Sequence, residues 1–365
     1  MKIFHCNHCQ HLVFFENFQC VACGHSLAYL PDAQALGSLE PALNGLWTSP
    51  VSRVRERTYR RCSNYALENV CNWAVASDDP NPLCLSCRLT RVIPDLSVTG
   101  NKEAWYRMET AKRRLVYTLI SLGLPVEPKR GDGDGGLIFD FLADVPGSGP
   151  ALTGHDDGVI TINLAEADDA QREHRRTQLH EPYRTLLGHF RHEIGHYYWD
   201  RLIYGSDRLE TFRNLFGDER ADYGESLQRH YAIGVRPDWQ DSFVSAYASS
   251  HPWEDWAESW AHFLHMLDAL ETAGACGLSL KPPRSDEPAM KAPAKGAGSF
   301  DRMISDWFSL TYVLNNLNRS LGQADGYPFV LSPAAVDKLR FVHETVGQGL
   351  REPRTRPLEN ASQAR

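Results

Sequence analysis

Cysteine residues are concentrated at the start of the chain, where the first 87 of the 365 residues hold eight of the nine cysteines. The first four form two Cys-x-x-Cys pairs, Cys6/Cys9 and Cys20/Cys23. Each pair can make a tight turn that presents two thiolates, and four thiolates complete a tetrahedral zinc site with no open position. We therefore predict a structural zinc ribbon over residues 1–28, in which metal binding contributes on the order of 10 kcal/mol to folding. A pair of redox motifs is the competing interpretation, but the βαβ pattern expected around a thioredoxin-like motif is missing.

The next four cysteines lie within residues 29–95, which we predict to be a second four-cysteine zinc-binding region. Cys84 and Cys87 form a Cys-x-x-Cys pair, whereas Cys62 and Cys71 are more loosely spaced. The alternative is that Cys62 and Cys71 are small buried apolar residues. The even number of cysteines and their confinement to a short segment favour a second structural zinc ion.

Charge and hydropathy exclude several classes of protein. The net charge is −8 at pH 7 and the pI is near 6.0, which argues against general nucleic-acid binding because such proteins carry a basic surplus. No apolar run is long enough to predict a membrane span. The N-terminal stretch lacks the apolar core of a signal peptide, so we expect a cytoplasmic location. A reducing cytoplasm disfavours disulfides, which agrees with cysteines that bind metal.

The remainder of the chain predicts a mainly helical α+β domain over residues 96–350 with a small sheet, followed by a flexible tail at 351–365. Apolar periodicity and turn residues set the element boundaries. A segment rich in Pro, Ala, Gly and Lys at 283–299 is typical of a mobile loop. The predicted helices are at 101–125, from near Glu181, and at 300–320 and 333–349; the predicted strands are at 137–144 and 158–168.

The helix that we expect to start near Glu181 contains a metal-binding pattern. His192 and His196 are four residues apart, so on a helix they lie on one face and can bind one metal ion. Glu193 follows the first histidine, and its carboxylate suits a general base for a water molecule held by the metal. The apolar residues around the motif predict a buried helix rather than a solvated one. A buried histidine pair beside a glutamate requires polar partners.

The third ligand of such a site is not given by the motif itself. A glycine and a third histidine would be needed at the positions of Trp199 and Leu202, so the longer metzincin pattern is excluded. A glutamate from a second helix is the other common solution. The residues leave two segments open. The first contains Asp218, Glu219 and Asp222. The second contains Glu254, Glu258, His251 and His262, and its two glutamates share one helical face.

The order and spacing of these motifs resemble known metallopeptidases. A tyrosine seven residues before the first Glu of "EDWAE" resembles gluzincins of the anthrax lethal factor type. That resemblance implies Glu254 as third zinc ligand, Glu258 as a residue that orients a histidine, and Tyr247 as a hydrogen-bond donor to the oxyanion. The order of zinc ribbon, HExxH and "HPWEDWAE" also resembles a bacterial family of predicted zinc-binding metallopeptidases, which implies peptidase activity.

We therefore expect a zinc peptidase with one catalytic and one or two structural zinc ions. Its substrate would be a peptide or protein, and the zinc ribbon could contact a protein partner. A substrate strand could pair with the edge of the strand at 158–168. The alternative is a non-catalytic interaction protein whose peptidase-like domain binds without cutting, and a third possibility is self-cleavage in the 283–299 loop.

Overall fold

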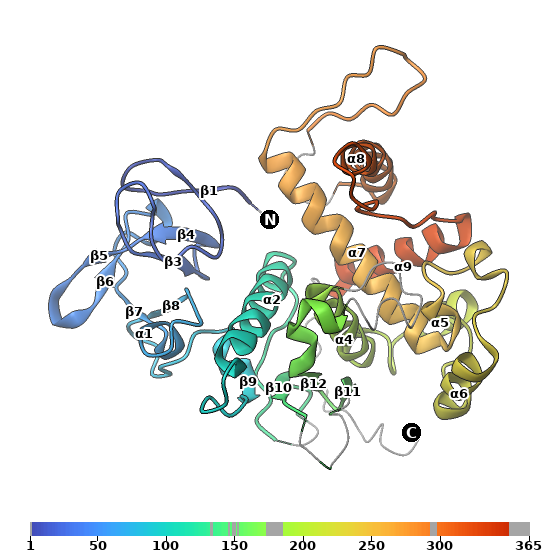
Figure 1. Cartoon of the computed structure of the whole chain (residues 1–365), viewed down its shortest axis with the longest axis horizontal. Helices are drawn as coiled ribbons and strands as arrows, with labels where there is room; N and C mark the ends of the chain where they lie inside the picture. The colour runs from blue at the N-terminus through green and yellow to red at the C-terminus, as the bar shows by residue number, and fades with distance from the viewer. Residues whose placement is uncertain are drawn as a thin grey trace. The chain divides into compact units, whose positions relative to one another are not determined.

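The computed structural model describes residues 2–131, 134–144, 147, 151, 153–172, 185–292 and 298–349. The chain forms two compact units, and Figure 1 traces its course by residue number. The first, called here the cysteine-rich unit, comprises Lys2–Arg130 and Gly136–Asp169. The second, the helical unit, comprises Gly131–Gly135 and Ala170–Arg365. The expected order of a cysteine-rich N-terminal region and a mostly helical region with a small sheet is confirmed. The boundaries at residues 28 and 95 stay predictions.

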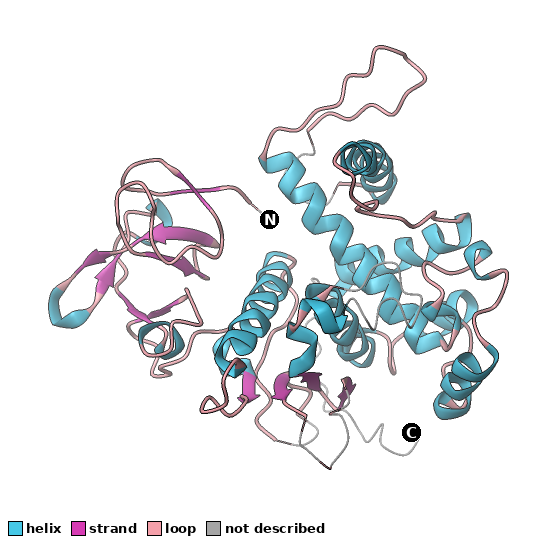
Figure 2. Cartoon of the chain, in the orientation of Figure 1, coloured by secondary structure: helices cyan, strands magenta, loops and turns pink. Residues whose placement is uncertain are grey.

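The N-terminal part of the cysteine-rich unit consists of short antiparallel strands joined by loops (Figure 2). Two hairpins, β1–β2 and β3–β4, come first, and a four-stranded sheet follows in the order β5-β6-β7-β8. The strands are β1 (Phe4–His5), β2 (Leu12–Val13), β3 (Leu27–Leu30), β4 (Ala35–Ser38), β5 (Glu40–Pro41), β6 (Trp47–Thr48), β7 (Tyr59–Arg61) and β8 (Ala74–Ala76). Short helical turns lie between them at η1 (Leu43–Gly45), η2 (Ser52–Val54) and α1 (Ser63–Ala66), and η3 (Cys87–Leu89) follows β8.

An aromatic cluster joins the parts of the cysteine-rich unit. The ring of Phe15 meets those of Tyr29 and Tyr117 edge-on, with ring centroids 5.2 and 5.4 Å apart. Tyr29 also packs on Trp73 at 4.6 Å. All four side chains are buried. Because aromatic rings bury large apolar areas, this cluster gives the short strands a core that their length alone would not supply.

A four-stranded sheet and a long helix complete this unit. The strand order is β11-β12-β10-β9, with β10 parallel to both neighbours and β11 antiparallel to β12. The elements are α2 (Asn101–Ser121), β9 (Thr90–Val92), β10 (Ile138–Leu142), β11 (Gly154–Asp156), β12 (Val159–Asn163) and η4 (Leu164–Ala167). The helix predicted at 101–125 and the two predicted strands are therefore present but shorter, and the second strand turns into the 3-10 helix η4.

The structure overturns the idea that a substrate strand pairs with β12. This strand has a partner on each side, because β10 runs along one edge and β11 pairs Gly154–Asp156 with Val159–Thr161 on the other. The prediction was wrong because the short strand β11 had not been recognised in the sequence. A strand with both edges paired has no backbone groups left to offer a peptide.

Helices make up the other unit. They are α4 (Leu186–Leu202), α5 (Leu209–Phe216), α6 (Tyr223–Ile233), η5 (Trp239–Asp241), η6 (Tyr247–Ser249), α7 (Pro252–Ala275), α8 (Phe300–Ser320) and α9 (Pro333–Gly349). The helix expected from near Glu181 is described from Leu186, with Thr185 as its N-cap. Residues 173–184 and the tail at 351–365 lie outside the described residues, as do 293–297 of the predicted loop. In the described part of the chain, none of the helices combines the length and apolar character needed to cross a membrane.

Helix α7 packs closely against α4, and a glycine makes this approach possible. A Cβ added at Gly195 would lie 3.0 Å from the Cα of Ala257 and 3.2 Å from the Cβ of Trp260. The indole of Trp256 donates a 2.8 Å hydrogen bond to the carbonyl oxygen of Gly195. Gly195 lies inside the HExxH motif, so a close contact of the two helices falls at the level of the predicted site.

A buried ion pair fastens α7 to α9. The ammonium of Lys338 lies 2.6 Å from a carboxylate oxygen of Asp255 and 2.7 Å from the carbonyl oxygen of Ser242. Burial raises the pKa of Asp255 to about 7, although Lys338 opposes this rise. Replacing Lys338 with methionine is expected to lower the free energy of unfolding by about 3–5 kcal/mol, because a buried carboxylate loses its partner. Denaturant unfolding followed by helix circular dichroism measures this change.

The exposed Lys291→Met is the matched control and should be nearly neutral. Adding Asp255→Asn to Lys338→Met should recover part of the loss, because the buried charge is then removed. Equal stability of wild type and Lys338→Met would contradict the assigned role of the pair.

Candidate functional site

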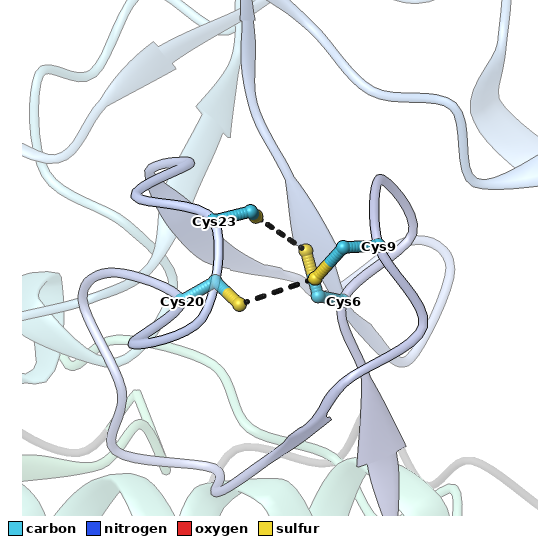
Figure 3. Close-up of side chains that lie close together, drawn as sticks. All are labelled: Cys6, Cys9, Cys20 and Cys23. Atoms are coloured by element: carbon cyan, nitrogen blue, oxygen red, sulfur yellow. Dashed lines mark hydrogen bonds between the residues drawn. The ribbon is translucent and has the colours of Figure 1, made fainter.

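The first cysteine cluster brings together the thiols of Cys6, Cys9, Cys20 and Cys23. Figure 3 shows the four side chains converging from two loops. The sulfur of Cys6 lies 3.7 Å from that of Cys23, and those of Cys9 and Cys20 are 3.6 Å apart. Tetrahedral zinc with bonds of about 2.3 Å separates its sulfur ligands by about 3.8 Å. The spacing therefore fits a closed four-thiolate zinc site.

The second cluster contains Cys62, Cys71, Cys84 and Cys87, all buried. The sulfurs of Cys71 and Cys84 are 3.7 Å apart. Backbone amides point at the thiols: that of Cys84 lies 3.3 Å from the sulfur of Cys62, and that of Cys87 lies 3.4 Å from the sulfur of Cys84. The loosely spaced Cys62 and Cys71 thus converge on the Cys-x-x-Cys pair. This arrangement disfavours the interpretation that Cys62 and Cys71 are only small buried apolar residues.

Charged side chains of α2 lie beside the second cluster, and sequence reasoning missed them. Glu109 lies 4.0 Å from the sulfur of Cys87 and 2.9 Å from the ammonium of Lys112, and both charged side chains are fully buried. Burial lowers the pKa of the neighbouring Arg113, but the nearby thiolates raise it more. These cations can therefore balance the negative charge of four thiolates. The sequence pattern that could have identified these residues is the spacing of Glu109, Lys112 and Arg113 at i, i+3 and i+4, which places three charges on one face of the helix.

The helical unit brings His192, His196 and Glu254 together. Their donor atoms all lie within 4.8 Å of one another. The two Nε2 atoms are 3.2 Å apart, and the carboxylate of Glu254 lies 3.0 Å from Nε2 of His192 and 3.6 Å from Nε2 of His196. Helix α4 supplies both imidazoles and the first turn of α7 supplies the carboxylate. The segment containing Glu254, rather than the one containing Glu219, lies against the histidines.

Neighbouring polar groups hold these three side chains in place. Oε1 of Glu258 lies 2.7 Å from Nδ1 of His192, and Ser245 donates a 2.6 Å hydrogen bond to Oε2 of the same carboxylate. The phenol of Tyr223 donates a 2.7 Å hydrogen bond to Oε1 of Glu254. Sequence reasoning missed Ser245 and Tyr223, because nothing in their local patterns points to α7.

The electrostatics of this cluster favour a cation. Burial raises the pKa of Glu254, but the two imidazoles and Tyr223 lower it more, to about 2. The pKa of Glu258 is lowered to about 2 as well, because its bond to His192 outweighs its burial. Burial lowers the pKa of His192, yet the two glutamates raise it well above its usual value. The buried carboxylate of Glu254 and the partly buried carboxylate of Glu258 therefore require positive charge between them.

Glu193 and Tyr247 face the same region. Glu193 is nearly buried, with 9% of its surface exposed. Burial is the main cause of the raised pKa of Tyr247, and the charges of Glu254 and Glu193 contribute to it. The ring of Tyr247 lies 5.9 Å from that of His192 between centroids. Within the described part of the chain, the phenol of Tyr247 makes no hydrogen bond, so its hydroxyl is available to a ligand.

The other acidic candidates are engaged elsewhere. Glu219 forms a pair with Arg213 at 2.5 Å, and Asp218 forms one with Arg220 at 2.7 Å. Asp222 caps the N-terminus of α6 by accepting a hydrogen bond from the amide of Glu225.

His251, the N-cap residue of α7, and His262, within that helix, also lie outside the three-donor cluster. His251 caps the helix by accepting a hydrogen bond from the amide of Trp253. Nδ1 of His262 lies 2.7 Å from the hydroxyl of Tyr327. Both imidazoles therefore serve the packing of the helix.

Comparison with models of known protein families shows the class to which this protein belongs. Residues 3–98 match the model of a zinc-ribbon domain. Residues 101–345 match the family described as "Putative zinc-binding metallo-peptidase". Since this match spans most of the chain, the protein belongs to that family.

Relatives occur in mycobacteria. Uncharacterized proteins of Mycobacterium bovis and of Mycobacterium tuberculosis strain H37Rv are each 44% identical to the chain over 349 residues. The alignments cover 95% of this chain and 96% of each relative. No solved structure matches the chain.

Proposed function

We propose that this protein is a zinc-dependent peptidase of the gluzincin type, similar to the anthrax lethal factor class. In this proposal His192, His196 and Glu254 hold the catalytic zinc ion. The observation that carries it is the convergence of the two Nε2 atoms, 3.2 Å apart, on the carboxylate of Glu254, whose Oε2 lies 3.0 Å from His192 and whose Oε1 lies 3.6 Å from His196. Zinc with bonds of about 2.0–2.1 Å to nitrogen and oxygen separates tetrahedral ligands by roughly 3.3 Å, close to these distances.

Two features of the donor set support a metal ion rather than an ion pair. A carboxylate only accepts hydrogen bonds, so Glu258 holds a proton on Nδ1 of His192, and a zinc ion at Nε2 would take the place of the second proton that the two glutamates favour there and would bind the lone pair. The buried Oε2 of Glu254 accepts no hydrogen bond, although it lies beside that Nε2 atom. A lone-pair nitrogen and an unsatisfied carboxylate oxygen in contact are stabilised by a shared cation.

The proposed mechanism assigns roles to the chain's own residues. Zinc would act as a Lewis acid that polarises the scissile carbonyl and makes water more acidic. Glu193 takes a proton from the attacking water, whose oxygen bonds to the carbonyl carbon, and then passes that proton to the leaving amine nitrogen as the C–N bond breaks. Tyr247 donates a hydrogen bond to the negative charge that develops on the carbonyl oxygen. Tyr223 and Glu258 are positioning residues for Glu254 and His192.

The main alternative is a protein whose peptidase-like unit binds peptides without cutting them, with the ribbon as a contact surface for a protein partner. Peptide-library digestion by the full zinc-loaded chain distinguishes the two. Cleavage that stops when zinc is chelated supports the peptidase, whereas binding without any cleavage favours the alternative. Mass spectrometry of the purified chain tests the third possibility, self-cleavage within 283–299.

Replacing Glu258 with glutamine is expected to weaken zinc binding at the catalytic site by about 10–100-fold, because a neutral amide orients and polarises His192 less well. Competition with a chromophoric chelator measures this affinity. Glu225→Gln, a matched change at an exposed position of α6, should leave the affinity unaltered. Equal affinities of the two variants would contradict the positioning role of Glu258.

A further inference from the structure

We propose a further, solvent-accessible metal site on the cysteine-rich unit, formed by His8, His25 and Glu40. It is separate from both cysteine clusters, and its ligand would be a divalent cation of the zinc class. His8 lies between the cysteines of the first Cys-x-x-Cys pair, His25 lies two residues after the second pair, and Glu40 begins β5.

The three side chains bring their donor atoms close together. One carboxylate oxygen, Oε1 of Glu40, lies 3.3 Å from Nε2 of His25 and 3.9 Å from Nδ1 of His8. The two imidazole rings stack with centroids 3.6 Å apart and planes at 21°. All three donor atoms lie within 4.8 Å of one another. The separations from Glu40 are near the roughly 3.3 Å between nitrogen or oxygen ligands of tetrahedral zinc. Because an imidazole binds metal in the plane of its ring, the stacked rings would turn out of their face-to-face arrangement when both bind one ion.

The backbone on which these side chains stand is held by hydrogen bonds. The carbonyl oxygen of His25 accepts a 2.8 Å hydrogen bond from the amide of Cys20. The amide of Leu39, next to Glu40, donates to the carbonyl oxygen of Ser26 at 2.8 Å.

The loop of His8 is held in the same way. The side chain of its neighbour Asn7 accepts a 3.2 Å hydrogen bond from the amide of Ser38 in β4. The three ligand positions are therefore preorganised, which lowers the entropy that a metal ion must overcome on binding.

The donor set selects the class of ion. Two imidazoles and one carboxylate suit zinc, nickel and copper, whereas calcium and magnesium prefer oxygen ligands alone. His8 and Glu40 have side chains 51% and 41% exposed, so water can fill the remaining position and the ion can exchange. In contrast, four thiolates leave no open position at the cysteine sites.

A bound ion would cross-link both cysteine loops of the ribbon to β5. Because it binds the folded arrangement and not the unfolded chain, it would stabilise the ribbon in proportion to the logarithm of the metal concentration. The arrangement thus makes the stability of the ribbon responsive to available zinc.

Calorimetric titration of the full chain with zinc tests the site, after dialysis against a chelator weak enough to leave the cysteine sites loaded. The titration is made on the full chain that carries His192→Ala, because this change removes zinc binding at the peptidase site. The chain should then bind one exchangeable equivalent, and adding Glu40→Gln or His8→Ala should abolish it. The exposed His11→Ala is the matched control and should retain it.

Hydrogen exchange of residues 6–41 gives a second readout that does not depend on counting ions. Added zinc should increase protection in the His192→Ala chain and in its His11→Ala derivative, but not after Glu40→Gln, a change outside the two cysteine loops. Retention of both the exchangeable equivalent and the added protection in Glu40→Gln and His8→Ala would overturn the proposal.

Discussion

Replacing Glu193 with glutamine is expected to lower the rate of peptide cleavage by about 10²–10⁴-fold while the zinc content stays the same. Glutamine keeps the size of the side chain but cannot accept the proton of water at neutral pH. The histidines and Glu254 are unchanged, so metal binding should persist. Cleavage of a peptide selected from a library, together with zinc analysis of the same preparation, measures both effects.

Glu225→Gln, at an exposed site on α6, is the matched control and should cleave at the wild-type rate. If Glu193→Gln cleaves at the wild-type rate, Glu193 is not the general base. If wild type and both variants bind peptides but cleave none of them, the peptidase proposal fails. The alternative, a unit that binds peptides without cutting them, is then supported. Loss of zinc together with activity would mean that Glu193 supports the metal site instead.

Replacing Cys84 with serine is expected to remove the zinc of the second cysteine cluster and to unfold much of the surrounding structure. Structural zinc contributes about 10–16 kcal/mol in small zinc domains, and a fully buried four-thiolate site cannot lose one ligand without leaving the others uncompensated. The buried Arg113 of α2 would also lose one of the thiolates that raise its pKa. Zinc analysis and the near-ultraviolet circular dichroism of buried Trp73 measure the outcome.

Cys276→Ser is the matched control, because this exposed cysteine lies outside both clusters. It should retain the zinc content and the spectrum of the wild type. A Cys84→Ser protein with wild-type zinc content and an unchanged spectrum would show that the second cluster is not a structural zinc site.

Local sequence patterns predicted the elements and the groups with metal-binding chemistry. The Cys-x-x-Cys pairs place two thiolates on one turn, and His192 and His196 share one helical face, so each spacing defines a half-site through backbone geometry alone. The apolar period also located α2, α8 and α9. The short strand β11 was missed because three residues carry little periodic signal, and this error led to the mistaken free edge of β12.

The choice between acidic segments required the tertiary structure. Glu219 and Glu254 are both glutamates in or near helices after the HExxH motif, and sequence distance does not rank them. Close packing at Gly195 brings the first turn of α7 to the histidines, whereas Arg213 pairs with Glu219.

The amino-acid sequence by itself determined which side chains can bind metal and on which local turn or helix face they stand, because those relations depend on a few neighbouring residues. The tertiary structure decided which half-sites meet. Tyr223, Ser245 and Glu40 acquire their partners only through contacts between distant segments, and such contacts follow from packing of the whole unit rather than from any local pattern.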